Sequence, residues 1–574
     1  MRISTTKTKN FEFVYLIKDF YSHGSRTTKI IEKLGTMAEL MTKLSTDREG
    51  VLSWAKSYAR EKTALEKEEN RKLSVSFSQT ALIGKDQRRM SSCGYLFLQA
   101  LYSRLKLGNS FRSIKARHRY SFDLDAVLSD LIFARILAPS SKVSSYETAK
   151  RFLEPPKYGL HDVYRALSLL SKEADFIQAE VYKNSNFISG RNRSVLYYDC
   201  TNYYFEIEQE DDFKRYGKSK EHRPNPIVQM GLFMDGDGIP LAFDLFSGNR
   251  NEQGSMKPLE QKIIKDFEFS RFIVCTDAGL GSEDNRFFNS VRGRSFIVTQ
   301  SLKKLPEEDR RAAFSDQGWK KVSDHKSVSL QKILGSETDD TALYYKELPL
   351  TTKKLQQRLI VTYSPKYAAY QKRIREAQIQ RALKLLQSGS IKRTAKNPND
   401  PARFIVKASV TPDGELAEHD LFSLDQSAID KEAMFDGFYA VCTDLFDDEI
   451  KDILKVSEQR WQIEESFRIL KTEFRSRPVY LRREDRIRAH FLTCFLSLLI
   501  LRLLEKELGK KYTVHSLLTV LRSMQLLELG DGYLPAYERN DITDALHEAF
   551  GFRTDFQIIS KQTLRNVIKQ SKQV

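Results

Sequence analysis

Apolar residues in the first third of the chain recur at a helical interval. From residue 28 to about 180 they are spaced mostly by three and four positions, as in Leu124, Val127 and Leu131. This spacing buries one face of each helix against its neighbours. We therefore predict an all-α amino-terminal region, residues 1–185, whose upstream part has room for a DNA-binding helix-turn-helix.

The pattern changes at residue 194, where strand-like segments begin. Residues 194–207 are rich in β-branched and aromatic side chains, and residues 226–246 hold two apolar runs separated by the turn sequence Asp-Gly-Asp-Gly. Helical and strand-like segments then alternate up to residue 300, which implies parallel pairing through crossover connections. Three antiparallel strands followed by this alternation are typical of the ribonuclease H-like fold. We predict an α/β core with a mixed sheet, beginning with residues 190–301.

A long segment, residues 302–435, interrupts this alternation. It contains strand-like stretches and a basic helix, so we predict a β-rich insertion subdomain, with a polar loop at 387–401. The core is expected to resume at 436–505, where a strand precedes a long helix from about residue 448 to 474. Residues 506–574 are expected to form a helical carboxy-terminal region.

The longest apolar run, Phe491–Leu504, is too short to span a bilayer and contains Arg502, so we expect a buried helix. The first ten residues are polar and basic, without the apolar stretch of a signal peptide. Five cysteines lie far apart, which disfavours a disulfide framework or a zinc site. No membrane association and a cytoplasmic location are therefore expected.

Positive charge is concentrated near the amino terminus. The net charge of +17 comes from 93 Lys and Arg against 76 Asp and Glu, and residues 1–120 alone carry 24 basic and 11 acidic side chains, a net of +13. Such asymmetry favours a polyanionic partner, nucleic acid first and an anionic membrane second. A basic surface that serves only solubility is the alternative.

Two aspartates occupy positions where a carboxylate needs a partner. Asp199 lies inside the first predicted strand, and Asp277 ends the fourth, followed by Gly279 and Gly281. An unpaired carboxylate in an apolar strand is unfavourable. The ribonuclease H strand order places strands one and four side by side, and two carboxylates at one point suit Mg²⁺ or Mn²⁺. The alternative for each alone is a cap or turn residue.

The long helix near residue 460 carries a third carboxylate. At about 100° per residue, Glu464 lies roughly 40° from Arg460 and roughly 20° from Lys471, so the three share one face. The adjacent Glu465 diverges by roughly 100° and is expected to face solvent or to pair with a base such as Arg468. By itself this pattern favours an exposed, salt-bridged helix face over a catalytic one.

At this point the sequence resembles a known family. The segment RWQIEESFRILK is similar to the signature Tyr-x2-Arg-x3-Glu-x6-Lys of bacterial insertion-sequence transposases of the DDE type. Arg460, Glu464 and Lys471 match in register, whereas the Tyr position falls on Ser457. The resemblance extends over roughly residues 194–500, including the segments YYDCTNYYFE, SKEHRPNPIVQ and VCTDAGLGSEDN.

The resemblance implies a DDE triad of Asp199, Asp277 and Glu464 that holds two Mg²⁺ or Mn²⁺ ions. The implied enzyme is a DNA transposase, which nicks double-stranded DNA at the terminal repeats of its element and joins the freed 3′-hydroxyl to target DNA. A homodimer in the DNA complex is expected, in the bacterial cytoplasm and on the nucleoid when DNA is bound. We expect phosphate contacts from the basic residues on and after the Glu helix, namely Arg460, Lys471, Arg475 and Arg477.

The sequence offers further candidates for DNA contacts. Trp319 could stack on an extruded base, whereas for Trp461 we favour core packing. His222 and Arg223 could approach the site from the connection between strands one and two, or form a loop salt bridge instead. Two other functions stay open, a nuclease on the same fold without strand transfer and a non-catalytic DNA-binding regulator descended from a transposase.

Overall fold

The computed structural model describes residues 1–9, 11–22, 25–69, 75–76, 78–335, 341–388, 399–410 and 416–573. Most of the segment 387–401, expected to be a loop, lies outside these residues. The chain divides into two compact units. The first contains residues 1–91, 526–537 and 553–566, and the second contains residues 92–525, 538–552 and 567–574.

The first unit begins with an antiparallel sheet where we expected helices. Strands β1 (Arg2–Lys7), β2 (Glu12–Ser22) and β3 (Ser25–Thr36) precede helices α1 (Met37–Leu44) and α2 (Arg48–Glu69). The prediction of an all-α region is wrong for residues 2–36. Val14 and Leu16, two positions apart on β2, are fully buried, and Val14 packs with Met37 and Leu40 of α1. This is the period of a strand with one buried face.

A second sheet joins one strand from near residue 90 with three strands from the carboxy-terminal region, in the order β19-β18-β17-β4. It contains β4 (Met90–Ser92), β17 (Gln525–Leu529), β18 (Gly532–Pro535) and β19 (Ile559–Ser560). The carboxy-terminal region, expected to be helical, therefore contains short strands in addition to its helices. Those helices are α18 (Val514–Ser523), α19 (Asp541–Phe550) and α20 (Lys561–Ser571).

Helices dominate the start of the second unit, as predicted, and several of them pack on one apolar helix. They are α3 (Tyr95–Arg104), α4 (Gly108–Arg117), α5 (Leu124–Leu137), α6 (Lys142–Ala149), α7 (Leu160–Lys172) and α8 (Ala174–Ile188). Helices α3, α5 and α7 pack against α17 (Glu484–Glu507). By length and composition α17 could cross a membrane, but 89% of its most apolar stretch is buried in the protein. The prediction of a buried helix is confirmed.

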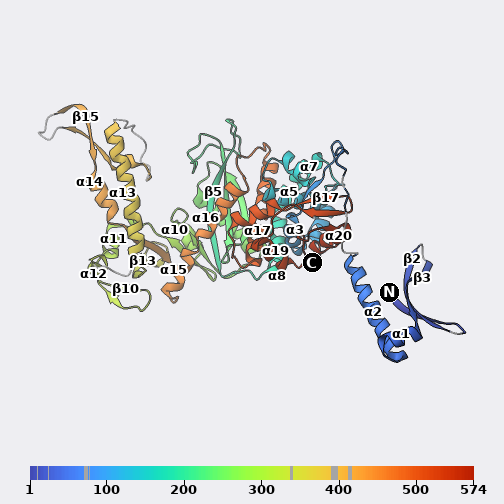
Figure 1. Cartoon of the computed structure of the whole chain (residues 1–574). Coiled ribbons are helices and arrows are strands. Elements are labelled where there is room, and N and C mark those ends of the chain that lie inside the picture. Colours follow the sequence, from blue (N-terminus) through green and yellow to red (C-terminus); the bar gives the residue numbers. More distant parts are fainter. Residues whose placement is uncertain are drawn as a thin grey trace. The chain divides into compact units, whose positions relative to one another are not determined.

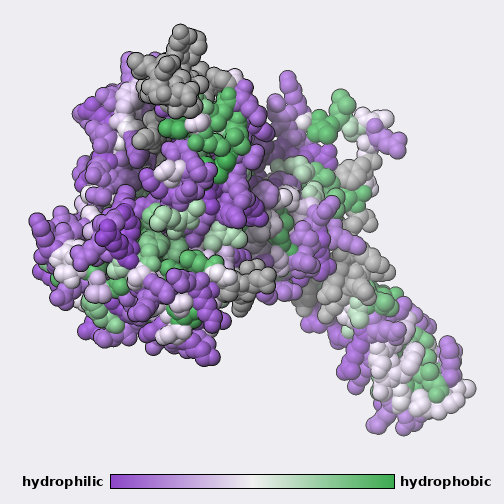
Figure 2. Space-filling model, turned by 90° about the vertical axis from the view of Figure 1, so that its left-hand side faces the viewer, coloured by the Kyte–Doolittle hydropathy of each residue, from purple (hydrophilic) through white to green (hydrophobic). Residues whose placement is uncertain are grey.

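Figure 2 shows a largely hydrophilic face, on which apolar residues form limited patches.

The core of the second unit is a ten-stranded mixed sheet (Figure 1). Its order, β11-β10-β12-β13-β16-β9-β8-β5-β6-β7, contains the predicted ribonuclease H-like arrangement from β9 to β7. Strands β5, β6 and β7 are antiparallel, and β8 and β9 follow in parallel. These strands are β5 (Val195–Tyr204), β6 (Ile227–Asp235), β7 (Pro240–Ser247), β8 (Phe272–Thr276) and β9 (Arg294–Thr299).

Strands of the insertion extend this same sheet. They are β10 (Trp319–Lys321), β11 (Ser327–Val328), β12 (Tyr344–Thr351) and β13 (Gln356–Tyr363), and β13 pairs with β16 (Phe438–Thr443), which pairs with β9. The rest of the insertion contains the hairpin β14 (Ile405–Val410) and β15 (Leu416–Leu424), and the helices α11 (Glu307–Ala313), α12 (Leu330–Gly335), α13 (Pro365–Ser388) and α14 (Gln426–Ala433). The insertion is thus continuous with the core sheet.

Helices cover the two faces of the core strands. On one face, α9 (Met256–Asp266) packs with Leu196, Tyr198 and Cys200 of β5. On the other, α15 (Ile450–Glu458) and α16 (Trp461–Arg468) precede a π-helical stretch, Ile469–Glu473. A short helix, α10 (Glu283–Phe288), lies between β8 and β9. The apolar residues Ile463, Phe467 and Leu470 of this helical segment are buried, so this face of the segment anchors it in the core.

Candidate active site

Asp199 and Asp277 lie side by side on neighbouring parallel strands. Strand β5 pairs with β8 so that Tyr197 is opposite Cys275. Asp199 lies two residues further along β5, and Asp277 directly follows the last residue of β8, so the two aspartates lie near one another at the carboxyl end of β8. The predicted adjacency of the two aspartates is confirmed, and carboxyl ends of such strands are where ligand sites form in α/β sheets.

The strand's alternation directs Asp199 toward the helix that carries Glu464. Tyr197, on the same face as Asp199, donates from its hydroxyl to the carbonyl oxygen of Val456 on α15 at 3.2 Å. Tyr198, on the opposite face, shares a hydrogen bond of 2.7 Å with Ser255, beside α9. Asp199 therefore faces α15 and α16.

Arg460 connects the three carboxylates electrostatically. Its guanidinium lies 2.9 Å from Oε1 of Glu464. Burial lowers the pKa of Arg460, but Glu464, Tyr439, Asp199 and Asp277 raise it more strongly, so the net shift is upward. Glu464 is 57% exposed and bound to Arg460. Among the residues that the structure describes, no three acidic, His or Cys side chains converge as a metal-binding group.

The aspartate pair has the chemistry of a divalent cation site. Burial raises the pKa of Asp199 to about 6, opposed by Lys220 and reinforced by Asp277. A cation between the carboxylates would stabilise both ionised forms, and oxygen donors suit Mg²⁺ or Mn²⁺. Gly281 lets the backbone approach here, because a Cβ on it would lie 2.2 Å from Cγ1 of Val298. The residues therefore fit such an ion, with Glu464 held by Arg460 in this conformation.

A second charged cluster adjoins the pair, and sequence reasoning missed its acidic members. Nζ of Lys471 lies 3.5 Å from Oε1 of Glu221, which also pairs with Arg477. Lys220 donates to the carbonyl oxygen of Cys200 and lies 3.4 Å from Glu252. Burial and the nearby Lys220 lower the pKa of Lys471 to about 8.

The loop that carries Lys220 and Glu221 also carries His222 and Arg223. Both of the latter are exposed, and the Arg223 guanidinium lies 4.5 Å from the ring centroid of Tyr204 on β5. The structure thus brings the SKEHRP segment to the predicted site. Lys220 and Glu221 directly precede His222 and Arg223 in this segment, and that position is the signal that could have identified them from the sequence. Arg475, another predicted phosphate contact, is exposed, with a φ of 43°.

Two tryptophan predictions are wrong. Trp319 is 0% exposed, and its indole donates to the carbonyl oxygen of Ser315 at 3.1 Å. It belongs to the hydrophobic cluster of the insertion, so it presents no face to a base. Trp461, expected in the core, is 58% exposed. On a helix it lies roughly 200° from the buried Ile463, which directs it to solvent.

The two adjacent glutamates of α16 separate as the helical period requires. Glu465 lies 3.2 Å from Arg468 and 2.9 Å from Arg502, while Glu464 shares the face of Arg460. The expected pairing of Glu465 with Arg468 is confirmed.

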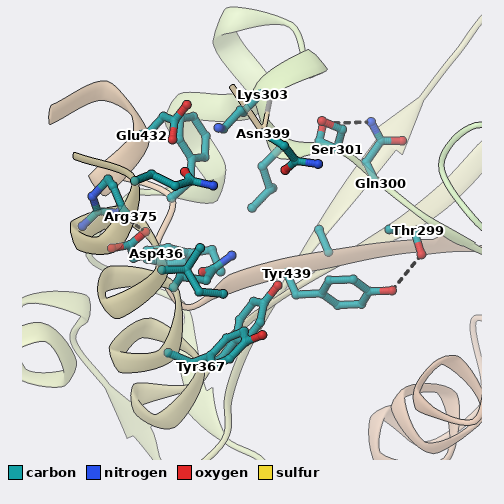
Figure 3. Close-up of a pocket in the computed structure, with 18 of the residues that line it drawn as sticks. Thr299, Gln300, Ser301, Lys303, Tyr367, Arg375, Asn399, Glu432, Asp436 and Tyr439 are labelled. Atoms are coloured by element: carbon teal, nitrogen blue, oxygen red, sulfur yellow. Dashed lines mark hydrogen bonds and ion pairs between the residues drawn. The ribbon is translucent and has the colours of Figure 1, made fainter. Parts of the chain in front are cut away.

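A cavity of about 460 Å³ adjoins this region between α13 and the ends of β9 and β16. Figure 3 shows Tyr439 of β16 directed toward Thr299, with a hydrogen bond of 2.7 Å between their side-chain oxygens. The Tyr439 hydroxyl also lies 3.3 Å from Oγ of Ser457, the residue at the Tyr position of the family signature. Tyr439 therefore brings a phenol hydroxyl to the place where the signature residue is missing.

Comparison with known proteins identifies the family. The family model for the transposase DDE domain matches residues 191–500, just over half of the chain. Comparison with curated protein sequences finds no match. Among solved structures, the piggyBac transposase synaptic complex with hairpin DNA shares 8% sequence identity at a TM-score of 0.33, covering 84% of this chain and 85% of that one. On the strength of the family match, this chain belongs to the transposases with a DDE domain.

Proposed function

We propose that this transposase cuts double-stranded DNA at the ends of its insertion element and joins the freed 3′-hydroxyl to target DNA. The observation that carries this proposal is the pair Asp199 and Asp277, near one another at the carboxyl end of β8, with Arg460 interacting with both and with Glu464. These side chains supply carboxylate oxygens for a metal ion and, at the same place, the positive charge of an arginine. The protein would act as a homodimer on two DNA ends, in the bacterial cytoplasm.

Asp199 and Asp277 would hold Mg²⁺ or Mn²⁺, with Glu464 as the third ligand once it leaves Arg460. Bound divalent ions would lower the pKa of the attacking water or 3′-hydroxyl and stabilise the leaving oxygen. Arg460, released from Glu464, would then be available to a DNA phosphate. Lys471 and Arg477 meet Glu221, and a phosphate that approaches them competes with this carboxylate.

The test uses labelled DNA ends that carry the terminal repeats of the element, a supercoiled target plasmid, and Mg²⁺ or Mn²⁺. Joined products are the expected result. Hydrolysis at the ends without joining would instead identify a nuclease. Binding without any metal-dependent nicking would identify a DNA-binding regulator.

A further inference from the structure

A second cavity, of about 430 Å³, opens where helix α6 begins, among α5, α6 and the segment that follows the Glu helix. Its lining includes Arg135, Lys142, Arg475, Arg477 and Tyr480. No acidic side chain lines it among the residues that the structure describes, and neither the two aspartates nor Glu464 takes part. The cavity is therefore strongly cationic and separate from the carboxylate set.

Two of these cations are buried without a complete set of partners. Lys142 is 4% exposed and Arg135 is 2% exposed. Within the described part of the chain, Nζ of Lys142 and Nε of Arg135 have no hydrogen-bond partner. Burial, reinforced by Arg135, lowers the pKa of Lys142 to about 7. A buried, unpaired ammonium is strongly unfavourable, and an anion in the cavity would provide the missing partner.

The backbone also contributes positive electrostatic potential to this cavity. Helix α6 begins at Lys142, with Ser141 as its N-cap, so its amino-terminal end lies in the cavity lining. Such ends bind phosphate groups through free amides and the helix dipole. Arg475 is an exposed member of the lining, and His490, a further member, stays neutral because burial lowers its pKa well below the usual value.

We propose that this cavity is a phosphate-binding site that takes a backbone phosphodiester of the DNA. The choice of DNA rests on the proposed function, whereas the anion site itself rests on the cations. Arg135 links the site to the Glu helix, because its Nη1 donates to the carbonyl oxygen of Phe474 at 3.1 Å and its Nη2 to that of Ser140 at 2.9 Å. A phosphate bound here would hold one DNA strand beside the end of the helix that carries Glu464.

The central variant is Lys142→Met, with Lys150→Met as its matched control. Lys150 follows the same helix but pairs with Glu147 at 2.6 Å and does not line the cavity. Both changes replace a lysine amino group by an uncharged thioether. Since Met removes a buried, unpaired ammonium, Lys142→Met is expected to melt at a higher temperature than the wild type in phosphate-free buffer, which also establishes that it folds.

Binding is measured with the full chain in buffer that contains EDTA. The two probes are inorganic phosphate, at constant ionic strength, and a 20-base-pair DNA duplex. Calorimetry should show saturable phosphate binding that is at least tenfold weaker in Lys142→Met and unchanged in Lys150→Met. Fluorescence anisotropy should show a slope of log K against log salt about 0.9 smaller in magnitude for Lys142→Met, the value of one lost phosphate contact.

A second variant, Arg475→Asn, tests the exposed cation of the cavity lining. Asn is chosen because it tolerates the positive φ at this position. It is expected to weaken both probes. Loss of phosphate binding with unchanged duplex binding would support an anion site and refute DNA as its ligand. If Lys142→Met binds both probes like the control, the inference is wrong. All these measurements exclude metal, so failure of the proposed strand cleavage would leave them unaffected.

Discussion

Glu464 and Glu465 offer a sharp test, because the structure gives the two neighbours different partners. Glu464→Gln removes an exposed ion pair with Arg460, and exposed pairs contribute about 0.2–1 kcal/mol. We therefore expect the free energy of unfolding to change by less than about 1 kcal/mol. Metal-dependent cleavage should nevertheless disappear, because the variant lacks the third carboxylate.

Glu465→Gln should behave in the opposite way. Its carboxylate lies 2.9 Å from Arg502, whose side chain is 10% exposed. Loss of a charged hydrogen bond to a buried group destabilises by about 1–3 kcal/mol. Arg502 keeps Glu505 at 2.9 Å and Ser466 at 3.0 Å, so the lower end of that range is expected. Cleavage should stay close to the wild-type rate.

Both variants are measured by urea unfolding and by nicking of a labelled element end in Mg²⁺. The expected result is a crossed pattern, in which one variant is stable and inactive and the other is destabilised and active. If Glu465→Gln is inactive while Glu464→Gln cleaves, the assignment of the third carboxylate is wrong. The positions given to Arg460 and Lys471 relative to the site would then lose their support.

Three further outcomes are expected. Asp199→Asn should abolish nicking and leave binding of DNA ends nearly intact, and wild-type nicking by this variant would remove the metal assignment. Helix α4 and the residues just after it carry three exposed cations, Arg112, Lys115 and Arg119. Neutralising all three should reduce the slope of log K for DNA binding against log salt by up to about 2.7. An unchanged slope would place DNA binding elsewhere. Burial raises the pKa of Glu260 to about 7, so its stabilising protonated form is lost as pH rises through 7. Glu260→Gln should therefore exceed wild-type stability at pH 8 by about 3 kcal/mol and match it near pH 4.5, and equal urea midpoints at pH 8 would contradict this.

Local periodicity was enough to predict much of the core and of the candidate site. Alternation in the first core strand and the helix–strand order that follows it placed Asp199 next to Asp277, because the fold allows few arrangements of such elements. The helical period separated Glu464 from Glu465 in the same way. The second result depends on residues a few positions apart, and the first depends on the order of elements that such local patterns predict.

Contacts between distant segments decided the rest. The insertion strands extend the core sheet because β13 pairs with β16, which no local pattern specifies. Trp319 is buried because the insertion packs around it, although its neighbours in sequence are polar. Arg135 and Phe474 meet across 339 positions of sequence, and that contact helps to form the cationic cavity with Lys142. Burial and charge are properties of the packed chain, so the exposure of a tryptophan and the isolation of a lysine emerge only when distant segments exclude water together.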